Sequence, residues 1–208
     1  MSADVKQVML TTRGVSCALV EEGPIPLDAE FLDEQGQRVR VGQYFGSKPV
    51  VLAFVYYDCP MLCTQVLGAL TSTLGVLSLN PGEDYEILLV SFDPREKPAQ
   101  AAAKKTEYMQ RFRRPAAESG WHFLTGEQAA ITQLTKAAGF RYAWDEQTQQ
   151  FAHPTGVIVV TPDGRPARYL FGIEYGPRDV RLALVEASEG RIGSVADNLL
   201  LFCYHYDP

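Results

Sequence analysis

The sequence predicts an α/β fold built on a parallel β-α-β unit, and two patterns support this. Two runs, 49–57 and 85–92, consist largely of β-branched, aliphatic and aromatic residues, which is typical of strands buried on both faces. Each run is followed by a predicted helix, over 61–79 and 98–112. Because strand, helix, strand and helix follow one another in this order, we expect parallel strands joined by a right-handed crossover.

The region before this unit predicts an N-terminal arm and a β-hairpin. Residues 1–28 show weak periodicity, and we expect an arm that packs on the body or on a partner. Two short strands, 29–32 and 37–41, follow, and the turn between them, 33–36, ends in glycine, as hairpin chemistry favours. The expected fold class is therefore α/β with an N-terminal β-hairpin extension.

Both helices of the unit have recognisable ends. Pro98 suits the first position of the second helix, where a missing N–H has no cost, and the segment 80–82 (Asn-Pro-Gly) stops the first helix. The one dense basic cluster, Arg111, Arg113 and Arg114, lies at the end of the second helix. We interpret this cluster as the charged end of that helix, since cations favour helix C-termini.

The second half of the chain alternates short strands and helices without a break in composition that would mark a second domain. Thr125 and Gln128 suit a capping box for a helix that ends near residue 138. The turn 161–164 has proline second and glycine fourth, which suits a type I turn between antiparallel strands. The strands expected here are 121–124, 141–144, 150–152, 156–161 and 165–171, and the further helices expected are 178–189 and 194–204.

The composition excludes several classes of protein. The net charge of -6 and the pI of about 5.1 argue against a nucleic-acid binder, which usually has a basic face. The longest apolar run, 50–57, is far shorter than the roughly 20 residues that span a bilayer, and no signal peptide is recognisable. Four cysteines are too few for a disulfide scaffold. Cys17 has no assigned role, and it either pairs with Cys203 or is free.

The other two cysteines are candidates for chemistry. Cys59 and Cys63 lie where the first buried strand passes into its helix, and Pro60 suits the first helical position, which makes Cys59 the N-cap. Residues four apart lie on one helix face with Cβ atoms about 5–6 Å apart, so the sulfurs can share a metal ion or close a disulfide. The positive end of the helix stabilises a thiolate, which is both metal ligand and nucleophile. Simple apolar packing of both thiols is the alternative.

A histidine far along the chain is expected at the same place. The carboxyl ends of parallel strands face the crevice in which α/β proteins place their sites, and Cys59 lies at such an end. If the strand 156–161 runs antiparallel to the strand 49–57, its beginning lies at that same edge. His153 precedes this strand by three residues, so we expect its imidazole beside the thiols. A surface or hydrogen-bonded core histidine is the alternative.

Three motifs together resemble the Sco/SenC family of copper-binding proteins. They are DCPMLC, SFDP and AHPTGVIVVTPDGRPARYLFG, and the similarity runs over about 26–189. The resemblance implies a thioredoxin-like fold and copper, as Cu(I) or Cu(II), held by Cys59, Cys63 and His153. It also implies a metallochaperone role in assembling the binuclear copper centre of cytochrome c oxidase. Asp93, in SFDP, matches an acidic position of the family near the site and is a candidate accessory residue, with capping of the following loop as the alternative.

The resemblance further implies an organisation and a location. We expect an N-terminal arm, 1–28, a thioredoxin-like copper-binding domain, 29–190, and a C-terminal helical tail, 191–208, that precedes a membrane anchor. The protein would be anchored at the periplasmic or extracytoplasmic face of a membrane. Its partner would be the copper-receiving subunit of cytochrome c oxidase, or another copper or thiol client. Cys203 and His205, in the tail, form a second weaker metal site, a relay to the partner, or a docking segment.

The types of ligand and the spacing of the two cysteines favour copper binding over the main alternative, thiol–disulfide exchange. Two thiolates and one imidazole suit Cu(I), and can also hold Cu(II) or zinc. A thiol–disulfide oxidoreductase would use Cys59 and Cys63 as catalytic residues, but dedicated enzymes of that kind have C-x-x-C spacing. Thr64 departs from the family pattern, which usually has a second proline there. Pro154 restricts the preceding His153 to an extended backbone.

Overall fold

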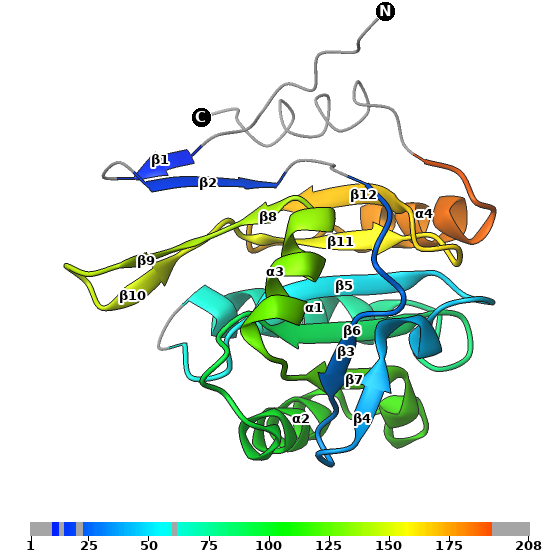
Figure 1. Ribbon diagram of the computed structural model, residues 1–208. Helices are drawn as coiled ribbons and strands as arrows, with labels where there is room; N and C mark the ends of the chain where they lie inside the picture. The colour runs from blue at the N-terminus through cyan, green and yellow to red at the C-terminus, as the bar shows by residue number, and fades with distance from the viewer. Residues whose placement is uncertain (1–9, 13–14, 20–22, 60–61, 193–208) are drawn as a thin grey trace, which may run out of the picture.

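The computed structural model describes residues 10–12, 15–19, 23–59 and 62–192, and its core is a five-stranded β-sheet (Figure 1). The strand order is β12-β11-β5-β6-β7. Strands β5, β6 and β7 are parallel, whereas β11 runs antiparallel to both β5 and β12. The predicted parallel unit and the predicted antiparallel pair are both confirmed. The bounds are β5 Val50–Val55, β6 Glu86–Ser91, β7 Trp121–Leu124, β11 Gly156–Val160 and β12 Pro166–Phe171.

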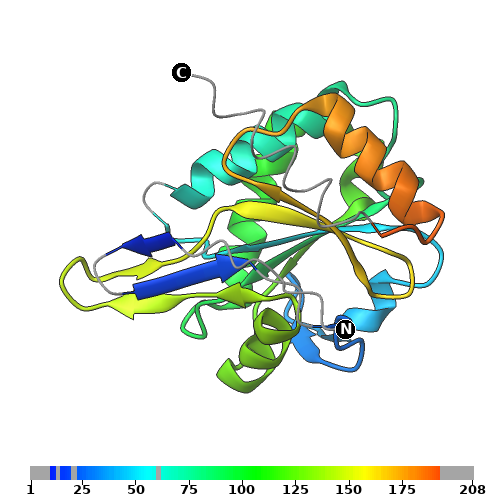
Figure 2. The same cartoon turned by 90° about the horizontal axis from the view of Figure 1, so that it is seen from above.

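Helices cover both faces of this sheet. Figure 2 shows α1 and α4 together on one face and α3 on the opposite face, while α2 packs against β7 and α1. Because both faces are covered, all six residues of β5 are buried, and the strand is apolar throughout. The helices are α1 Leu62–Val76, α2 Pro98–Phe112, α3 Gln128–Ala137 and α4 Pro177–Ser188, and the 3-10 helices are η1 Val41–Tyr44 and η2 Pro115–Gly120.

The predicted N-terminal hairpin is confirmed as β3 and β4, and a partly buried ion pair fixes it to the body. Lys105 Nζ lies 2.6 Å from Glu34 Oε1, and the other carboxylate oxygen accepts the Phe123 N–H over 3.2 Å. Burial alone would raise the pKa of Glu34, but the hydrogen bond and charge of Lys105 outweigh burial, and the pKa is lowered. The hairpin is thereby tied to α2 and β7. Its strands are β3 Glu30–Leu32 and β4 Arg38–Arg40.

Part of the predicted arm forms strands that pair with the body. Strands β1 and β2 form an antiparallel hairpin, and β2 also pairs with β8. Strands β9 and β10 form the hairpin predicted over 141–152, and Trp144 lies opposite Phe151 in it. Figure 1 shows this hairpin extending beyond the end of the five-stranded sheet. The bounds are β1 Leu10–Thr12, β2 Val15–Leu19, β8 Phe140–Arg141, β9 Ala143–Asp145 and β10 Gln150–Ala152.

The basic cluster after α2 lies at helix ends, as predicted. Arg111 is in the last turn of α2, and Arg113 is its left-handed C-cap, with φ of 55°. Arg114 donates hydrogen bonds to the carbonyl oxygens of Gly75 and Leu77 over 2.6 and 2.9 Å. These carbonyls belong to the end of α1, where a helix leaves its last acceptors without partners. The cluster therefore stabilises two helix ends.

Two details of the predicted helices are wrong. Helix α1 ends at Val76, about one turn before the predicted end. The expected capping box does not form, because Glu127 is the N-cap of α3, and Thr125 instead pairs with Leu32 through two backbone hydrogen bonds of 2.7 and 2.9 Å. The predicted helix 194–204 lies outside the described residues. Among the described helices, none has the length and apolarity needed to cross a bilayer.

Candidate metal centre

Both cysteines of the C-x-x-x-C motif lie at the carboxyl end of β5, where the chain passes into α1. Cys59 is 7% exposed and Cys63 is 3% exposed, and both thiols are free. The backbone N–H of Cys63 donates to Cys59 Sγ over 3.4 Å. This bond satisfies one of the amides that the first turn of a helix leaves without a carbonyl partner. The two sulfurs are therefore neighbours at the start of α1, as predicted, while Pro60 lies outside the described residues.

His153 lies between β10 and β11, and its ring faces the same corner. Its Nε2 lies 3.8 Å from Cys63 Sγ, and its Nδ1 lies 2.9 Å from the carbonyl oxygen of Pro154. A carbonyl oxygen can only accept a hydrogen bond, so Nδ1 carries the proton in the neutral ring. The lone pair of the neutral imidazole is consequently on Nε2, which is the nitrogen that faces the thiol.

An aromatic cage holds the imidazole ring. The ring centroid of His153 lies 6.0 Å from that of Tyr56, edge to face, 5.2 Å from that of Phe92, and 6.2 Å from that of Phe140. These residues come from the end of β5, the end of β6 and β8. The packing restricts the orientations that the ring can adopt.

The two thiols have opposite acidities because they share one proton. A hydrogen bond from Cys63, and weaker ones from His153 and Tyr56, lower the pKa of Cys59 well below its ordinary value despite burial. The pKa of Cys63 is raised, since its proton is held by Cys59 and burial disfavours a second thiolate. The pair thus provides a ready thiolate at Cys59 and a protonated thiol at Cys63.

A buried glutamate that the sequence analysis missed holds the loop that carries Cys59. Glu96 is 3% exposed, and its two carboxylate oxygens accept the backbone N–H groups of Tyr57 and Asp58, each over 2.8 Å. The Ser91 hydroxyl donates to the same carboxylate. Burial raises the pKa of Glu96 against these hydrogen bonds, which favour the ionised form. The only sequence signal was its place just after a buried strand, which many surface acids share.

Asp93, the candidate accessory residue, is engaged within its own loop. Its carboxylate accepts the backbone N–H of Arg95 over 2.9 Å and receives the Arg95 guanidinium, with Nη2 to Oδ2 at 2.6 Å. These contacts match the loop-capping alternative. An accessory role at the metal centre remains a prediction.

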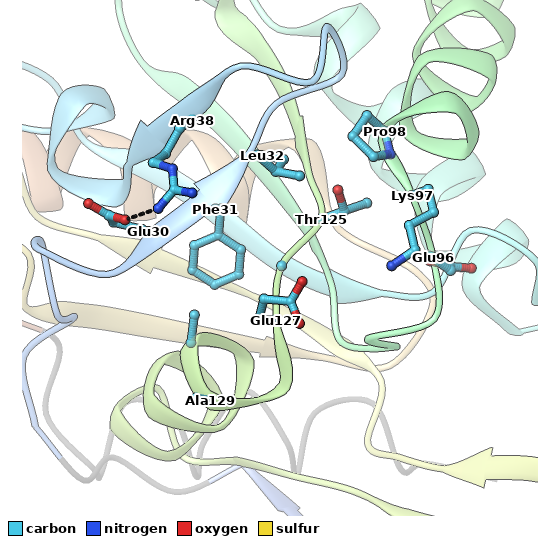
Figure 3. Close-up of a pocket in the computed structure, with 12 residues that line it drawn as sticks. Glu30, Phe31, Leu32, Arg38, Glu96, Lys97, Pro98, Thr125, Glu127 and Ala129 are labelled. Atoms are coloured by element: carbon cyan, nitrogen blue, oxygen red, sulfur yellow. Dashed lines mark hydrogen bonds and ion pairs between the residues drawn. The ribbon is translucent and has the colours of Figure 1, made fainter.

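Glu96 also lines a cavity of about 300 Å³ between the β3–β4 hairpin and the N-termini of α2 and α3. In Figure 3 the Glu30–Arg38 ion pair, 2.9 Å long, lies at one end, and Glu96 and Lys97 lie at the other. The hydroxyl of Thr125, in the wall, has no hydrogen-bond partner within the described part of the chain. None of the residues of the thiol corner lines this cavity. Glu96 does, and it also binds the backbone of the loop just before Cys59.

The donor set of the thiol corner fits a soft metal ion. A sulfur at about 2.3 Å and a nitrogen at about 2.05 Å from one ion lie roughly 3.6–3.8 Å apart at tetrahedral to trigonal angles. The Cys63 Sγ to His153 Nε2 distance of 3.8 Å agrees with this separation. Among the described residues, no three Cys, His, Asp or Glu side chains are already gathered as a finished metal site. Cys59, Cys63 and His153 are instead neighbours held by hydrogen bonds to one another and to the backbone.

Comparison with known proteins decides the family. The sequence profile described as SCO1/SenC matches residues 22–185, which include both cysteines and His153. This chain belongs to the SCO1/SenC family. A candidate copper-binding protein from Stutzerimonas stutzeri is 28% identical over 118 residues, which are 55% of this chain and 53% of that protein. The chain thus spans about half the length of this curated relative.

Solved structures share the fold. A candidate electron transfer protein from Aquifex aeolicus VF5 superposes with a TM-score of 0.72 at 23% identity, covering 82% of this chain and 95% of that one. Arabidopsis thaliana ScoI, a structure with copper bound, superposes with a TM-score of 0.61 at 20% identity, covering 81% and 98%. The expected thioredoxin-like α/β fold with an N-terminal hairpin is therefore confirmed for the described residues.

Several predicted roles fall outside the described part of the chain. Cys203 and His205 lie beyond it. The backbone of Cys17 pairs with Leu10 in the β1–β2 hairpin, but its side chain is not described. A second metal site in the tail, and a pairing of Cys17 with Cys203, stay predictions.

Proposed function

We propose that this protein is a metallochaperone that carries one copper ion on Cys59, Cys63 and His153. The observation that carries the proposal is the His153 ring, whose Nδ1 faces the Pro154 carbonyl while Nε2 lies 3.8 Å from Cys63 Sγ. In metal sites, the histidine nitrogen that does not bind the metal usually donates a hydrogen bond to a carbonyl or carboxylate oxygen, and this bond orients the ring. Membership of the SCO1/SenC family, and copper in the Arabidopsis structure, support copper as the cargo.

The residues would share the work of taking up the ion. Cys59 offers a thiolate, and Cys63 loses its proton when the cargo binds, because metal ligation requires the thiolate form. His153 would bind through Nε2, since Nδ1 carries the proton of the neutral ring. Two soft sulfurs and one nitrogen suit Cu(I) and also hold Cu(II). Three protein ligands leave a position at which a client ligand can attack, which favours transfer over permanent storage.

The recipient in this proposal is the copper-receiving subunit of cytochrome c oxidase, at assembly of its binuclear centre, or another copper or thiol client. The protein would act at an extracytoplasmic membrane face, held by an anchor that follows the tail 191–208. Both parts follow from the family resemblance and extend the proposal beyond the site itself.

Copper titration of ligand variants tests the proposal. We expect one Cu(I) per chain, measured by competition with a chromophoric chelator. Cys63→Ser and His153→Ala should weaken binding by at least about 100-fold, since loss of even an outer-sphere partner costs about 10–100-fold. His122→Gln is the matched control, because His122 pairs with Glu86 in the sheet over 3.0 Å. Unchanged affinity in His153→Ala would refute the proposed ligand set.

A second function, thiol–disulfide exchange, is favoured by the opposite acidities of the two thiols. A low pKa suits an attacking Cys59, and a neighbouring protonated Cys63 suits the resolving role. This alternative predicts reduction of a disulfide substrate by the metal-free protein, lost in Cys59→Ser and Cys63→Ser and retained in His153→Ala. Absence of such turnover in the reduced protein would eliminate it.

A further inference from the structure

Arg95, in the loop between β6 and α2, has an exposed guanidinium that is nevertheless tightly held. Its side chain is 63% exposed, whereas that of its partner Asp93 is 7% exposed. Nε donates to Oδ1 over 2.8 Å, and Nη2 donates to Oδ2 over 2.6 Å. A two-point contact with a buried carboxylate fixes the plane of the guanidinium as well as its position.

The fixed guanidinium lies against the β9–β10 hairpin. Arg95 Cζ is 4.8 Å from the ring centroid of Trp144 and 5.5 Å from that of Phe151. These two rings are cross-strand partners, 4.9 Å apart and edge to face. A cation within about 6 Å of an aromatic ring is attracted to it. One arginine thus joins the loop after β6 to both strands of a hairpin that extends beyond the sheet.

The far side of Phe151 belongs to the cage around the imidazole. Its ring contacts Tyr56 at 5.5 Å and Phe92 at 5.3 Å. The ring of His153, two residues further along, contacts the same two residues. Residues two apart in extended backbone project to one side, so the placement of Phe151 also sets that of His153.

We propose that Arg95 is a positioning residue for the metal centre. It latches the β9–β10 hairpin to the loop after β6 and thereby holds His153 beside the thiols. This inference rests on the proposed copper-binding function.

The chain contains a matched control for the latch. Asp163 and Arg165 have the same spacing as Asp93 and Arg95, and Arg165 Nε donates to Asp163 Oδ2 over 2.7 Å. This pair lies in the β11–β12 turn, and its guanidinium is stacked on no ring among the described residues. Arg165→Gln therefore removes an arginine–aspartate pair without removing a ring contact.

The first measurement uses the metal-free protein. Amide hydrogen exchange of residues 143–152 should quicken about 10-fold in Arg95→Gln and in Trp144→Leu, and should be unchanged in Arg165→Gln. Because Trp144→Leu removes the ring and leaves the arginine–aspartate pair, it tests the latch independently. In the double variant the effects should not add, since both changes break one contact. Unchanged exchange in both single variants would overturn the latch, whatever metal the protein carries.

The second measurement tests positioning. Arg95→Gln should lower Cu(I) affinity about 10-fold, as outer-sphere changes commonly do, and should weaken the histidine nitrogen coupling in the Cu(II) spectrum. Arg95→Lys, which retains the cation without the two-point contact, should recover only part of the loss. If His153→Ala weakens copper binding but Arg95→Gln changes neither affinity nor nitrogen coupling, the positioning role is refuted. If His153→Ala has no effect, the proposed ligand set fails instead, and hydrogen exchange still decides the latch.

Discussion

The segment that carries the cysteines and the segment that carries His153 are held in different ways. Cys59 and Cys63 lie where the fully buried β5 passes into α1, and the carboxylate of Glu96 fixes the connecting backbone from within. His153 follows a two-stranded hairpin whose ring contacts depend on the exposed Arg95. The comparison teaches that the sulfurs form the rigid half of the proposed centre, on a fully buried strand, whereas the imidazole follows a hairpin that is held by an exposed side chain.

The largest effect that we expect is a difference in alkylation rate between Cys59 and Cys63, the two thiols of the rigid half. In reduced, metal-free protein bearing Cys17→Ser and Cys203→Ser, we expect iodoacetamide to label Cys59 at least about 100-fold faster than Cys63 near neutral pH, because only the thiolate reacts. Both thiols are similarly buried, so acidity decides the difference. Mass spectrometry of the labelled peptides measures both rates.

The pH dependence of labelling follows from the directions of the two pKa shifts. Because the pKa of Cys59 is lowered, its thiolate persists below neutral pH, and its labelling rate should change little as the pH falls from neutral to mildly acidic. The pKa of Cys63 is raised, so its labelling should require alkaline solution. Equal rates with a common midpoint near pH 8.5, the usual value for a free cysteine, would contradict the shared proton.

The anchor of the rigid half should be the next most sensitive point. Glu96→Ala leaves the N–H groups of Tyr57 and Asp58 without their acceptor in a buried place, and we expect a loss of about 2–4 kcal/mol in the free energy of unfolding. Denaturant titration measures it. Glu127→Ala, at an exposed N-cap without a side-chain cap bond, should change stability by less than about 0.5 kcal/mol. A similar value for both variants would show that the loop does not depend on Glu96.

The β3–β4 hairpin should show the smallest effect. It is a counterpart to β9–β10, because both members of its ion pair are partly buried, whereas Arg95 is exposed. The pKa of Glu34 is lowered by Lys105, so the ion pair stabilises the fold fully above the ordinary value of 4.5, and the contribution is lost as the pH falls through the folded-state value. Glu34→Gln should cost about 1–3 kcal/mol at neutral pH and progressively less in acid. Thermal unfolding at several pH values measures this. A constant difference between variant and parent across the acid range would contradict the assignment.

The parts of the fold that depend on local pattern were predictable from sequence. The run that became β5 is apolar throughout and the run that became β6 is apolar except at its two ends, because both faces of the sheet are covered. This property was enough to predict the parallel unit. The position of His153 followed from one topological step, the antiparallel pairing of β11 with β5. Pattern and topology together were enough to predict that His153 lies beside Cys63, 90 residues away in the sequence.

The sequence could not predict long-range contacts between residues that lie in no recognisable sequence pattern. Glu96 holds an amide 39 residues away, and nothing near it distinguishes it from a solvated acid. The role proposed for Arg95 depends on its contacts with aromatic rings of a hairpin that is distant in the sequence. Thr125 had the residue type of a helix cap, but pairing with Leu32 in a β-bridge prevailed over that local preference. In each case long-range pairing outweighed local preference.

The bond between His153 Nδ1 and the Pro154 carbonyl has one more consequence. It selects the tautomer of the neutral ring, with the proton on Nδ1 and the lone pair on Nε2, 3.8 Å from the Cys63 sulfur. In the proposed site, the ring would therefore need no change of tautomer before an ion binds.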